Sequence, residues 1–194
     1  MAQLNRTGFL EGVLSVGQVF PDFMLPNAEG RLVSLAAVLA RGPVVISFFR
    51  GEWCPFCKLM LTGLAEAVPE IEAAGATLLA LTPETGGLAL TMKQRHDARF
   101  EVLSDVDCGA GLGAGVIFRV PKLYRARLEA IGLDFNKRHG NGGWFLPIPA
   151  TFILTPDGVI AWRFASLDFS ERAEPADVLA ALRQLPQRQL PAMA

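Results

Sequence analysis

The decisive stretch of this 194-residue chain is VVISFFRGEWCPFCK, residues 44–58. Its first six residues, 44–49, are nearly all β-branched or aromatic, which predicts a strand buried on both faces. A helical pattern begins near Cys54 and continues to Val68, and we expect Pro69 to kink or break that helix. The two cysteines of this stretch, Cys54 and Cys57, therefore lie where a buried strand gives way to a helix.

Further strands and helices alternate along the chain. We expect strands at 76–81, 100–103, 150–154 and 159–164, and helical segments at 70–74, within 83–99, at 121–131 and at 175–185. Short extended pieces flank a turn within 16–35, and residues 134–143 read as a polar loop. The turn Pro156-Asp157-Gly158 joins the last two strands as a hairpin. This order predicts an α/β fold with a sheet of mixed direction.

The chain reads as one domain with short extensions. Residues 1–15 show no clear pattern and are expected to form an N-terminal arm. Residues 16–185 form the domain, with an insertion around 108–143. Residues 186–194 contain two prolines and are expected to form a loose tail.

Composition excludes several classes of function. Apolar residues make up 51% and charged residues 19%, so the chain is globular rather than disordered. The net charge is −1, and no stripe of basic residues points to a nucleic-acid partner. The longest apolar stretches are strand-length, which argues against a membrane span. We see no signal peptide and expect a soluble, cytoplasmic protein.

Cys54 and Cys57 are the strongest chemical signal. The start of a helix carries unpaired N–H groups and partial positive charge, which favour a thiolate over a thiol. Cysteines spaced three apart on a helix can reach one another, and Pro55 fits the first helical position. Trp53 can shield one side, and Arg50 adds positive charge nearby. A redox-active pair is the favoured interpretation.

Other interpretations of these residues are weaker. Zinc needs about four ligands, and Cys108, His96 and His139 are scattered single residues. Two inert buried cysteines are the second alternative. The Gly-rich run 109–115 does not match a nucleotide-binding fingerprint and is better explained as a helix start with close backbone packing. Cys108 is most simply a lone thiol, with a resolving role as the alternative.

Five stretches of the chain together form a recognisable pattern: PDFMLPNAEGRLVSL (21–35), FFRGEWCPFC (48–57), TLLALTPET (77–85), LSD (103–105) and LPIPATFILTPDGVIAWRF (146–164). This pattern resembles the alkyl hydroperoxide reductase/thiol-specific antioxidant group, meaning peroxiredoxins and their relatives within the thioredoxin superfamily. The resemblance spans roughly residues 16–185 and is closest to a peroxiredoxin-like branch with Arg-Gly-x-Trp-Cys-Pro-x-Cys. It implies a thioredoxin-like fold with no organic or metal cofactor.

The resemblance leaves the nucleophile open. Typical peroxiredoxins carry Pro-x-x-x-Thr-x-x-Cys. Aligned on Cys57, this chain has Arg50 in place of the proline and Cys54 in place of the threonine. Aligned on Cys54, it has Ser47 and Gly51 at these positions. The Phe-Phe strand fits the first frame better, whereas thioredoxin-like proteins use the first cysteine, and we slightly favour Cys54.

Three further residues enter through the resemblance. Thioredoxin-like proteins have a cis-proline before the late hairpin, so we expect a cis Ile148–Pro149 bond beside the cysteines. An arginine before the last helix stabilises the thiolate in the resembling family, which points to Arg172, with Arg163 as a weaker rival. Trp53 and Pro149 are the expected substrate-binding residues.

The resulting hypothesis is thiol-dependent reduction of peroxides through a cycle between the Cys54/Cys57 dithiol and its disulfide. A thioredoxin-type reductant would restore the dithiol. The alternatives are an oxidoreductase acting on protein disulfides and a redox sensor without turnover. We also expect a homodimer, since apolar residues are abundant.

Overall fold

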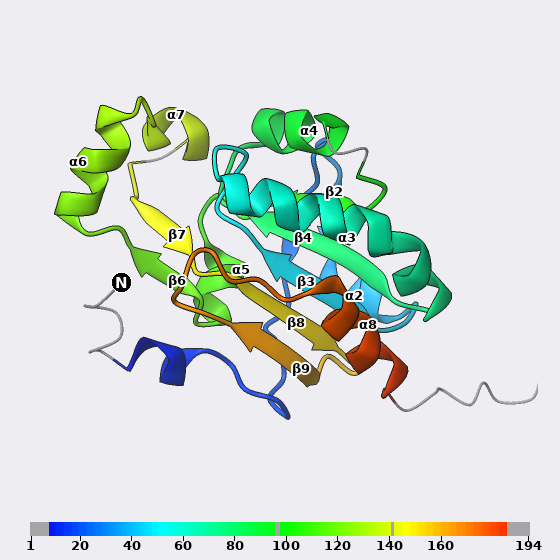
Figure 1. The fold of residues 1–194 in the computed structure, drawn as a ribbon. Coiled ribbons are helices and arrows are strands. Elements are labelled where there is room, and N and C mark those ends of the chain that lie inside the picture. Colours follow the sequence, from blue (N-terminus) through cyan, green and yellow to red (C-terminus); the bar gives the residue numbers. More distant parts are fainter. Residues whose placement is uncertain (1–7, 96–97, 141, 186–194) are drawn as a thin grey trace, which may run out of the picture.

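The structure is a computed structural model that describes residues 8–95, 98–140 and 142–185. Its centre is a five-stranded sheet in the order β5-β4-β3-β8-β9 (Figure 1). The strands are β3 (Val44–Phe48), β4 (Thr77–Thr82), β5 (Glu101–Ser104), β8 (Ala150–Leu154) and β9 (Ile160–Ala165). Strands β3, β4 and β5 are parallel, whereas β8 is antiparallel to both β3 and β9. The predicted α/β sheet of mixed direction is confirmed.

Helices and two small ribbons surround this sheet. The helices are η1 (Phe9–Gly12), α2 (Leu35–Leu39), α3 (Pro55–Ala73), α4 (Gly86–Arg95), α5 (Gly109–Gly113), α6 (Lys122–Ala130), α7 (Phe135–His139) and α8 (Pro175–Arg183). One antiparallel ribbon joins β1 (Met24–Pro26) to β2 (Leu32–Ser34), and the other joins β6 (Ile117–Arg119) to β7 (Phe145–Pro147). Within the described residues, no helix is both long and apolar enough to cross a membrane.

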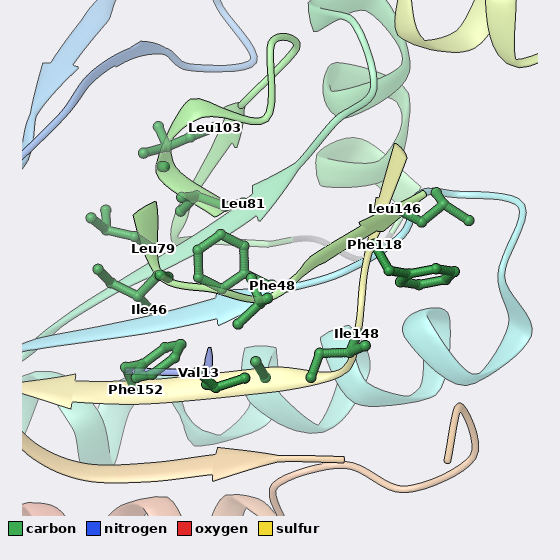
Figure 2. Packing of buried hydrophobic residues seen from close by; sticks show 14 of the residues in the cluster. Val13, Ile46, Phe48, Leu79, Leu81, Leu103, Phe118, Leu146, Ile148 and Phe152 are labelled. Atoms are coloured by element: carbon green, nitrogen blue, oxygen red, sulfur yellow. The ribbon is translucent and has the colours of Figure 1, made fainter. Parts of the chain in front are cut away.

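The central strand β3 is buried on both faces because a separate hydrophobic core packs against each face of the sheet. Successive side chains of a strand point to opposite faces. Val45 and the following Phe49 pack with residues of α3 and α8, and the Ser47 hydroxyl donates to the sulfur of Met60 on α3. Ile46 and Phe48 belong to the second core, on the opposite face (Figure 2). The cysteines therefore follow a strand that is held from both sides.

Aromatic rings from three segments of the chain meet in the core opposite α3. The rings of Phe48 and Phe152 (Figure 2) meet edge to face with centroids 6.2 Å apart. The ring centre of Phe20 lies 5.4 Å from that of Phe152. Burial of each such side chain contributes about 1.5–3 kcal/mol. This packing joins the N-terminal segment, β3 and β8, and so positions the strand that leads to the cysteines.

Helix α3 continues through Pro69, so the predicted break is wrong. The proline ring is exposed, and the carbonyl that loses its hydrogen-bond partner lies on the half-exposed Ala65. The buried stripe continues on both sides of it, through Leu64, Val68 and Ile71. Packing of this stripe against the sheet outweighs the missing hydrogen bond.

The structure differs from the sequence-based expectation in two segments, residues 134–143 of the insertion and the N-terminal arm. The predicted loop 134–143 contains helix α7, whose first turn is capped by the Asp134 side chain accepting from the Lys137 N–H. Residues 8–15 of the predicted arm are packed: Val13 is only 2% exposed and the Leu14 N–H donates to the Ala114 carbonyl. The predicted boundaries of arm, domain and tail stay predictions. Residues 186–194, the predicted tail, lie outside the described residues.

A glycine substitution tests this N-terminal packing. Gly115 and Gly132 both have positive φ, +74° and +81°, so alanine strains either one by about 1–2 kcal/mol. A Cβ at Gly115 would also lie 2.1 Å from the Gly12 carbonyl oxygen, whereas a Cβ at Gly132 meets nothing within 4 Å. We expect Gly115→Ala to lower the free energy of unfolding by about 1–3 kcal/mol more than Gly132→Ala. Denaturant unfolding followed by circular dichroism measures both, and equal losses would contradict this packing.

Candidate active site

The cysteine pair lies at the junction between β3 and α3. Cys54 is the N-cap residue of α3, with extended backbone angles, and Pro55 occupies the first helical position. Proline fits there because that position has no intrahelical N–H bond to lose. Both cysteines are reduced and 0% exposed. The sequence prediction of a dithiol at the start of a helix is confirmed in its placement.

The environment separates the two thiols. The pKa of Cys54 is lowered to about 5, first by a hydrogen bond from the Cys57 thiol and then by the positive charge of Arg50, against the effect of burial. Burial raises the pKa of Cys57 well above its ordinary value, and its role as donor to Cys54 adds to the rise. The two shifts favour the thiolate on Cys54 and the proton on Cys57.

Two arginines from distant parts of the chain contact the sulfurs. Arg50 Nη2 donates to Cys54 Sγ at 3.1 Å. Arg172 Nη2 lies 3.4 Å from Cys57 Sγ and 3.9 Å from Cys54 Sγ, and its Nη1 donates to the carbonyls of Phe169 and Glu171. These guanidinium groups favour negative charge on sulfur and disfavour a metal cation there. No cluster of three or more metal-ligating side chains occurs among the described residues.

Aromatic rings enclose Arg50. Its guanidinium carbon lies 4.0 Å from the ring centre of Phe169 and 5.0 Å from that of Trp53. Trp53 is half-buried and packs against Phe135 of α7, with ring centres 5.4 Å apart. The predicted shielding role of Trp53 therefore extends to the arginine. The insertion supplies one wall of this site, which the sequence analysis does not anticipate.

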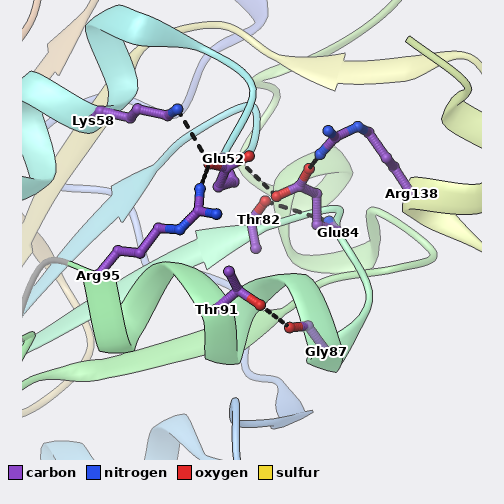
Figure 3. Close-up of polar contacts among 8 residues, drawn as sticks. All are labelled: Glu52, Lys58, Thr82, Glu84, Gly87, Thr91, Arg95 and Arg138. Carbon is purple, nitrogen blue, oxygen red and sulfur yellow. Dashed lines mark hydrogen bonds and ion pairs between the residues drawn. The ribbon is translucent and has the colours of Figure 1, made fainter. Parts of the chain in front are cut away.

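A buried carboxylate anchors the loop that carries Arg50 (Figure 3). Glu84, 0% exposed, accepts from the Glu52 backbone N–H at 2.7 Å and from Arg138 Nη1 at 2.7 Å. Burial raises the pKa of Glu84, although both hydrogen bonds oppose the rise. The Glu52 side chain in turn pairs with Lys58 and Arg95. Because Arg138 belongs to α7, this network ties the insertion to the loop before Cys54.

Gly51 allows the close approach of this loop to Glu84. Its φ is +138°, and an added Cβ would lie 2.5–2.9 Å from the Glu84 carboxylate atoms. Any side chain at position 51 would therefore push the carboxylate away from the Glu52 N–H. The sequence signal for the network is this glycine beside charged residues, but the partners are too distant in sequence to be paired from it.

The expected cis bond at Pro149 is wrong: no peptide bond among the described residues is cis. Pro149 lies at a bend between β7 and β8, and the Ile148 N–H before it donates to the Val116 carbonyl at 2.9 Å. A trans bond is the ordinary state of an X–Pro peptide in a folded protein. Pro149 itself is buried and directly precedes β8, whose first residue, Ala150, pairs with Phe48 at the end of β3. It thus lies at the cysteine end of the sheet.

Three other candidate residues lie elsewhere or have chemistry unsuited to the site. Arg163 Nη1 donates to the carbonyls of Val13 and Leu14, so it holds the N-terminal segment. Cys108 is buried at the start of α5, and burial with the charges of Asp105 and Asp107 raises its pKa to about 12. His139 is buried against Phe135, and burial lowers its pKa to about 4. His96 lies outside the described residues.

The contact between Arg50 and Cys54 is the main feature missing from the sequence-based expectations, which treat Arg50 only as nearby positive charge. A cavity of about 720 Å³ lies between α3 and the segment before α8, and it is lined by Arg172 but by neither cysteine. Its walls include Phe56, Leu59 and Met60 on one side and Arg172 on the other. It offers solvent a route toward Arg172.

Sheet order, flanking helices and a cysteine pair capping the first long helix define a thioredoxin-like fold. The family model for the AhpC/TSA family matches residues 16–163. The chain therefore belongs to the AhpC/TSA family, as the sequence resemblance implies.

Known proteins agree with this assignment. A putative peroxiredoxin bcp of Coxiella burnetii is 28% identical over 94 residues, which are 48% of this chain and 62% of the relative. Peroxiredoxin Q of rice chloroplasts is 28% identical over 101 residues, covering 52% and 46% of the two chains. This chain thus matches only about half the length of such curated relatives.

Solved structures show the same fold. Peroxidoxin BcpB from Mycobacterium tuberculosis superposes with a TM-score of 0.72 at 19% identity, covering 90% of this chain and 99% of that one. Peroxiredoxin Q of Xanthomonas campestris gives 0.66 at 22% identity, covering 88% and 96%. The thioredoxin-like fold is therefore confirmed.

The lowered pKa of Cys54 predicts that its thiol ionises at acidic pH. A pKa of about 5 lies well below the ordinary value of about 8.5 for a cysteine. Thiolate absorbance near 240 nm in the reduced protein should therefore rise with a midpoint near pH 5 and be level at neutral pH. Cys54→Ser should remove this step and Cys108→Ser should keep it. A midpoint above pH 8 in the wild type would contradict the assignment.

The buried carboxylate of Glu84 should contribute more to the free energy of unfolding than an exposed carboxylate does. Glu84→Gln weakens the hydrogen bonds to Arg138 and the Glu52 N–H, and should lower the free energy of unfolding by about 2–3 kcal/mol. Glu70→Gln is the matched control, because the Glu70–Arg183 pair is 61% and 67% exposed. It should change stability by less than about 1 kcal/mol. Denaturant unfolding compares the two, and equal effects would rule out an anchoring role for Glu84.

Proposed function

We propose that this protein reduces hydroperoxides, with Cys54 as the nucleophile and Cys57 as the resolving thiol. The observation that carries the proposal is the buried Cys54 sulfur, which faces the guanidinium groups of Arg50 and Arg172. A thiolate is the reactive form of cysteine, and nearby positive charge also stabilises negative charge that develops during the reaction. The family assignment and the peroxiredoxin relatives support the same chemistry.

The reaction balances with these two sulfurs alone. The Cys54 thiolate attacks one oxygen of the hydroperoxide, and its electron pair forms the S–O bond as the O–O bond breaks. Cys54 becomes a sulfenic acid, and the leaving oxygen takes up a proton and departs as water or an alcohol. Cys57 then attacks the sulfenic sulfur, its proton and the hydroxyl leave as water, and a disulfide remains.

Regeneration requires an external dithiol. Thiol–disulfide exchange with a thioredoxin-type reductant would return both cysteines to the reduced state. Arg172 holds both sulfurs in reach of positive charge, and Trp53 and Pro149 border the site as proposed substrate-binding residues. We also propose that the protein acts in the cytoplasm and as a homodimer.

Reduction of protein disulfides is the second candidate, and burial disfavours it. Exchange with a protein disulfide requires the attacking sulfur to line up with a bulky S–S bond. Cys54 is 0% exposed, so a small hydroperoxide needs far less opening of the site than a protein substrate does. A redox sensor would use the same pair once and would not consume repeated equivalents of oxidant.

Serine variants test the roles of the cysteines. With Cys54 as nucleophile, Cys57→Ser should react with one equivalent of hydrogen peroxide and stop as a sulfenic acid. Cys54→Ser should lose nearly all fast reaction, because burial raises the pKa of both remaining thiols, Cys57 and Cys108. Stopped-flow oxidation with a sulfenic-acid trap and mass spectrometry measures both, and Cys108→Ser serves as the control with unchanged rates.

Turnover separates the candidates. With a thioredoxin system present, the wild type should consume many equivalents of peroxide per chain and reduce a protein disulfide substrate slowly. Fast reaction of Cys54→Ser but not of Cys57→Ser would reverse the two roles. A wild type no faster with peroxide than a free thiol would contradict peroxide reduction altogether.

A further inference from the structure

Arg50 is a buried cation without a carboxylate partner. Its side chain belongs to a residue that is only 4% exposed. None of the ion pairs among the described residues includes it. Its nearest anionic group is the Cys54 sulfur, 3.1 Å from Nη2. Burial of an unpaired cation is unfavourable, so the thiolate acts as its counter-charge.

The guanidinium group is also held in one orientation. Phe169 and Trp53 lie 4.0 Å and 5.0 Å from its central carbon, and contacts with aromatic faces hold a cation in place. Because Nη2 is directed at Cys54, the planar fork places its other donors at fixed positions beside the sulfur. Arg50 is thus preorganised rather than free to turn toward solvent.

Two donors of this fork have no acceptor within the described part of the chain. Nε and Nη1 of Arg50 are both buried and form no hydrogen bond there, and the same holds for Nε1 of Trp53. Buried donors are nearly always paired, because leaving them unpaired is unfavourable. The site therefore offers donors beside a nucleophilic sulfur and lacks the acceptors to match them.

Arg172 differs from Arg50 in this respect. Its Nη1 already donates to two carbonyls, those of Phe169 and Glu171, and its Nη2 lies nearer to Cys57 than to Cys54. Its bonds position the segment before α8 as well as the sulfurs. The contrast assigns the two arginines different tasks.

We propose that Arg50 is a catalytic residue that binds the hydroperoxide and stabilises its leaving oxygen; this inference rests on the peroxide reduction proposed above. An oxygen of a hydroperoxide can accept a hydrogen bond from Nε or from Nη1, the two donors of Arg50 that lack partners. As the Cys54 thiolate attacks one oxygen, the O–O bond breaks and its electron pair moves to the other oxygen. Arg50 remains protonated throughout and stabilises that negative charge until a proton from solvent completes the water or alcohol.

Two reagents separate this role from simple stabilisation of the thiolate. Iodoacetamide reports the ionisation of Cys54 but has no leaving peroxide oxygen, whereas hydrogen peroxide reports both. Stopped-flow rates with each reagent are measured from pH 4 to pH 9 for the wild type, Arg50→Gln and Arg50→Lys. Arg125→Gln is the matched control, because Arg125 also lies over a tryptophan, 4.5 Å from the Trp144 ring centre.

We expect a different outcome for each reagent. Arg50→Gln should shift the alkylation midpoint to higher pH, with the rate recovering above the new midpoint. Its rate with peroxide should stay about 100-fold or more below the wild type even there, since that is the usual effect of losing one donor to a developing oxyanion. Arg50→Lys keeps the charge but not the fork, so it should retain more of the ionisation than of the peroxide rate. Arg125→Gln should leave both rates unchanged.

The opposite outcomes are equally clear. Recovery of the peroxide rate together with alkylation, in Arg50→Gln or in Arg50→Lys, would reduce Arg50 to a group that only lowers the pKa of Cys54. Thermal unfolding checks that the variants are folded. If Arg50→Gln is not folded, the Arg50→Lys rates alone decide the question. A slow wild type with peroxide would overturn peroxide reduction and this role together, whereas a fast wild type with unaffected Arg50 variants overturns this role only.

Discussion

The contact between the Arg50 guanidinium and the Cys54 sulfur is the constraint on which the site depends. Neither group is stable alone in a buried position: the cation lacks a carboxylate, and the thiolate lacks water. Together they compensate one another at the start of α3, where the helix adds its own favourable field. Protonation of Cys54 would leave the guanidinium without an anionic partner, so this contact favours the charged form of the Cys54 sulfur.

The surrounding structure keeps this contact in place. β3 ends two residues before Arg50 and is buried on both faces, so the position of the start of the loop is fixed. Glu84 holds the middle of the loop through the Glu52 N–H, and Arg138 links that carboxylate to α7. The insertion is therefore part of the site rather than an appendage, because it supplies both an ion-pair partner and an aromatic wall.

Differences between expectation and structure have specific physical causes. Pro69 does not end α3, because an exposed proline loses one hydrogen bond while the buried stripe around it keeps its packing. The polar composition of 134–143 favours a loop, but capping by Asp134 and burial of Phe135 are enough to form a short helix. The cis bond at Pro149 was implied only by resemblance to thioredoxin-like proteins, and the path of the chain from β7 does not require it.

Local chemistry determined what the sequence alone could reveal: a buried strand, a dithiol at a helix start, a late hairpin and a family resemblance. Each of these depends on residues close together in the chain, whose spacing reflects strand and helix geometry. Only the tertiary structure decided which sulfur carries the charge. That choice depends on the hydrogen bond from Cys57 to Cys54, on the charge of Arg50 and on the deeper burial of Cys57, whereas Arg172, 118 residues from Cys54, lowers the pKa of Cys57 and so opposes it. Burial and the orientation of charged groups are set by segments that pack together from distant parts of the chain, so the motif alone does not fix the ionisation of its two cysteines.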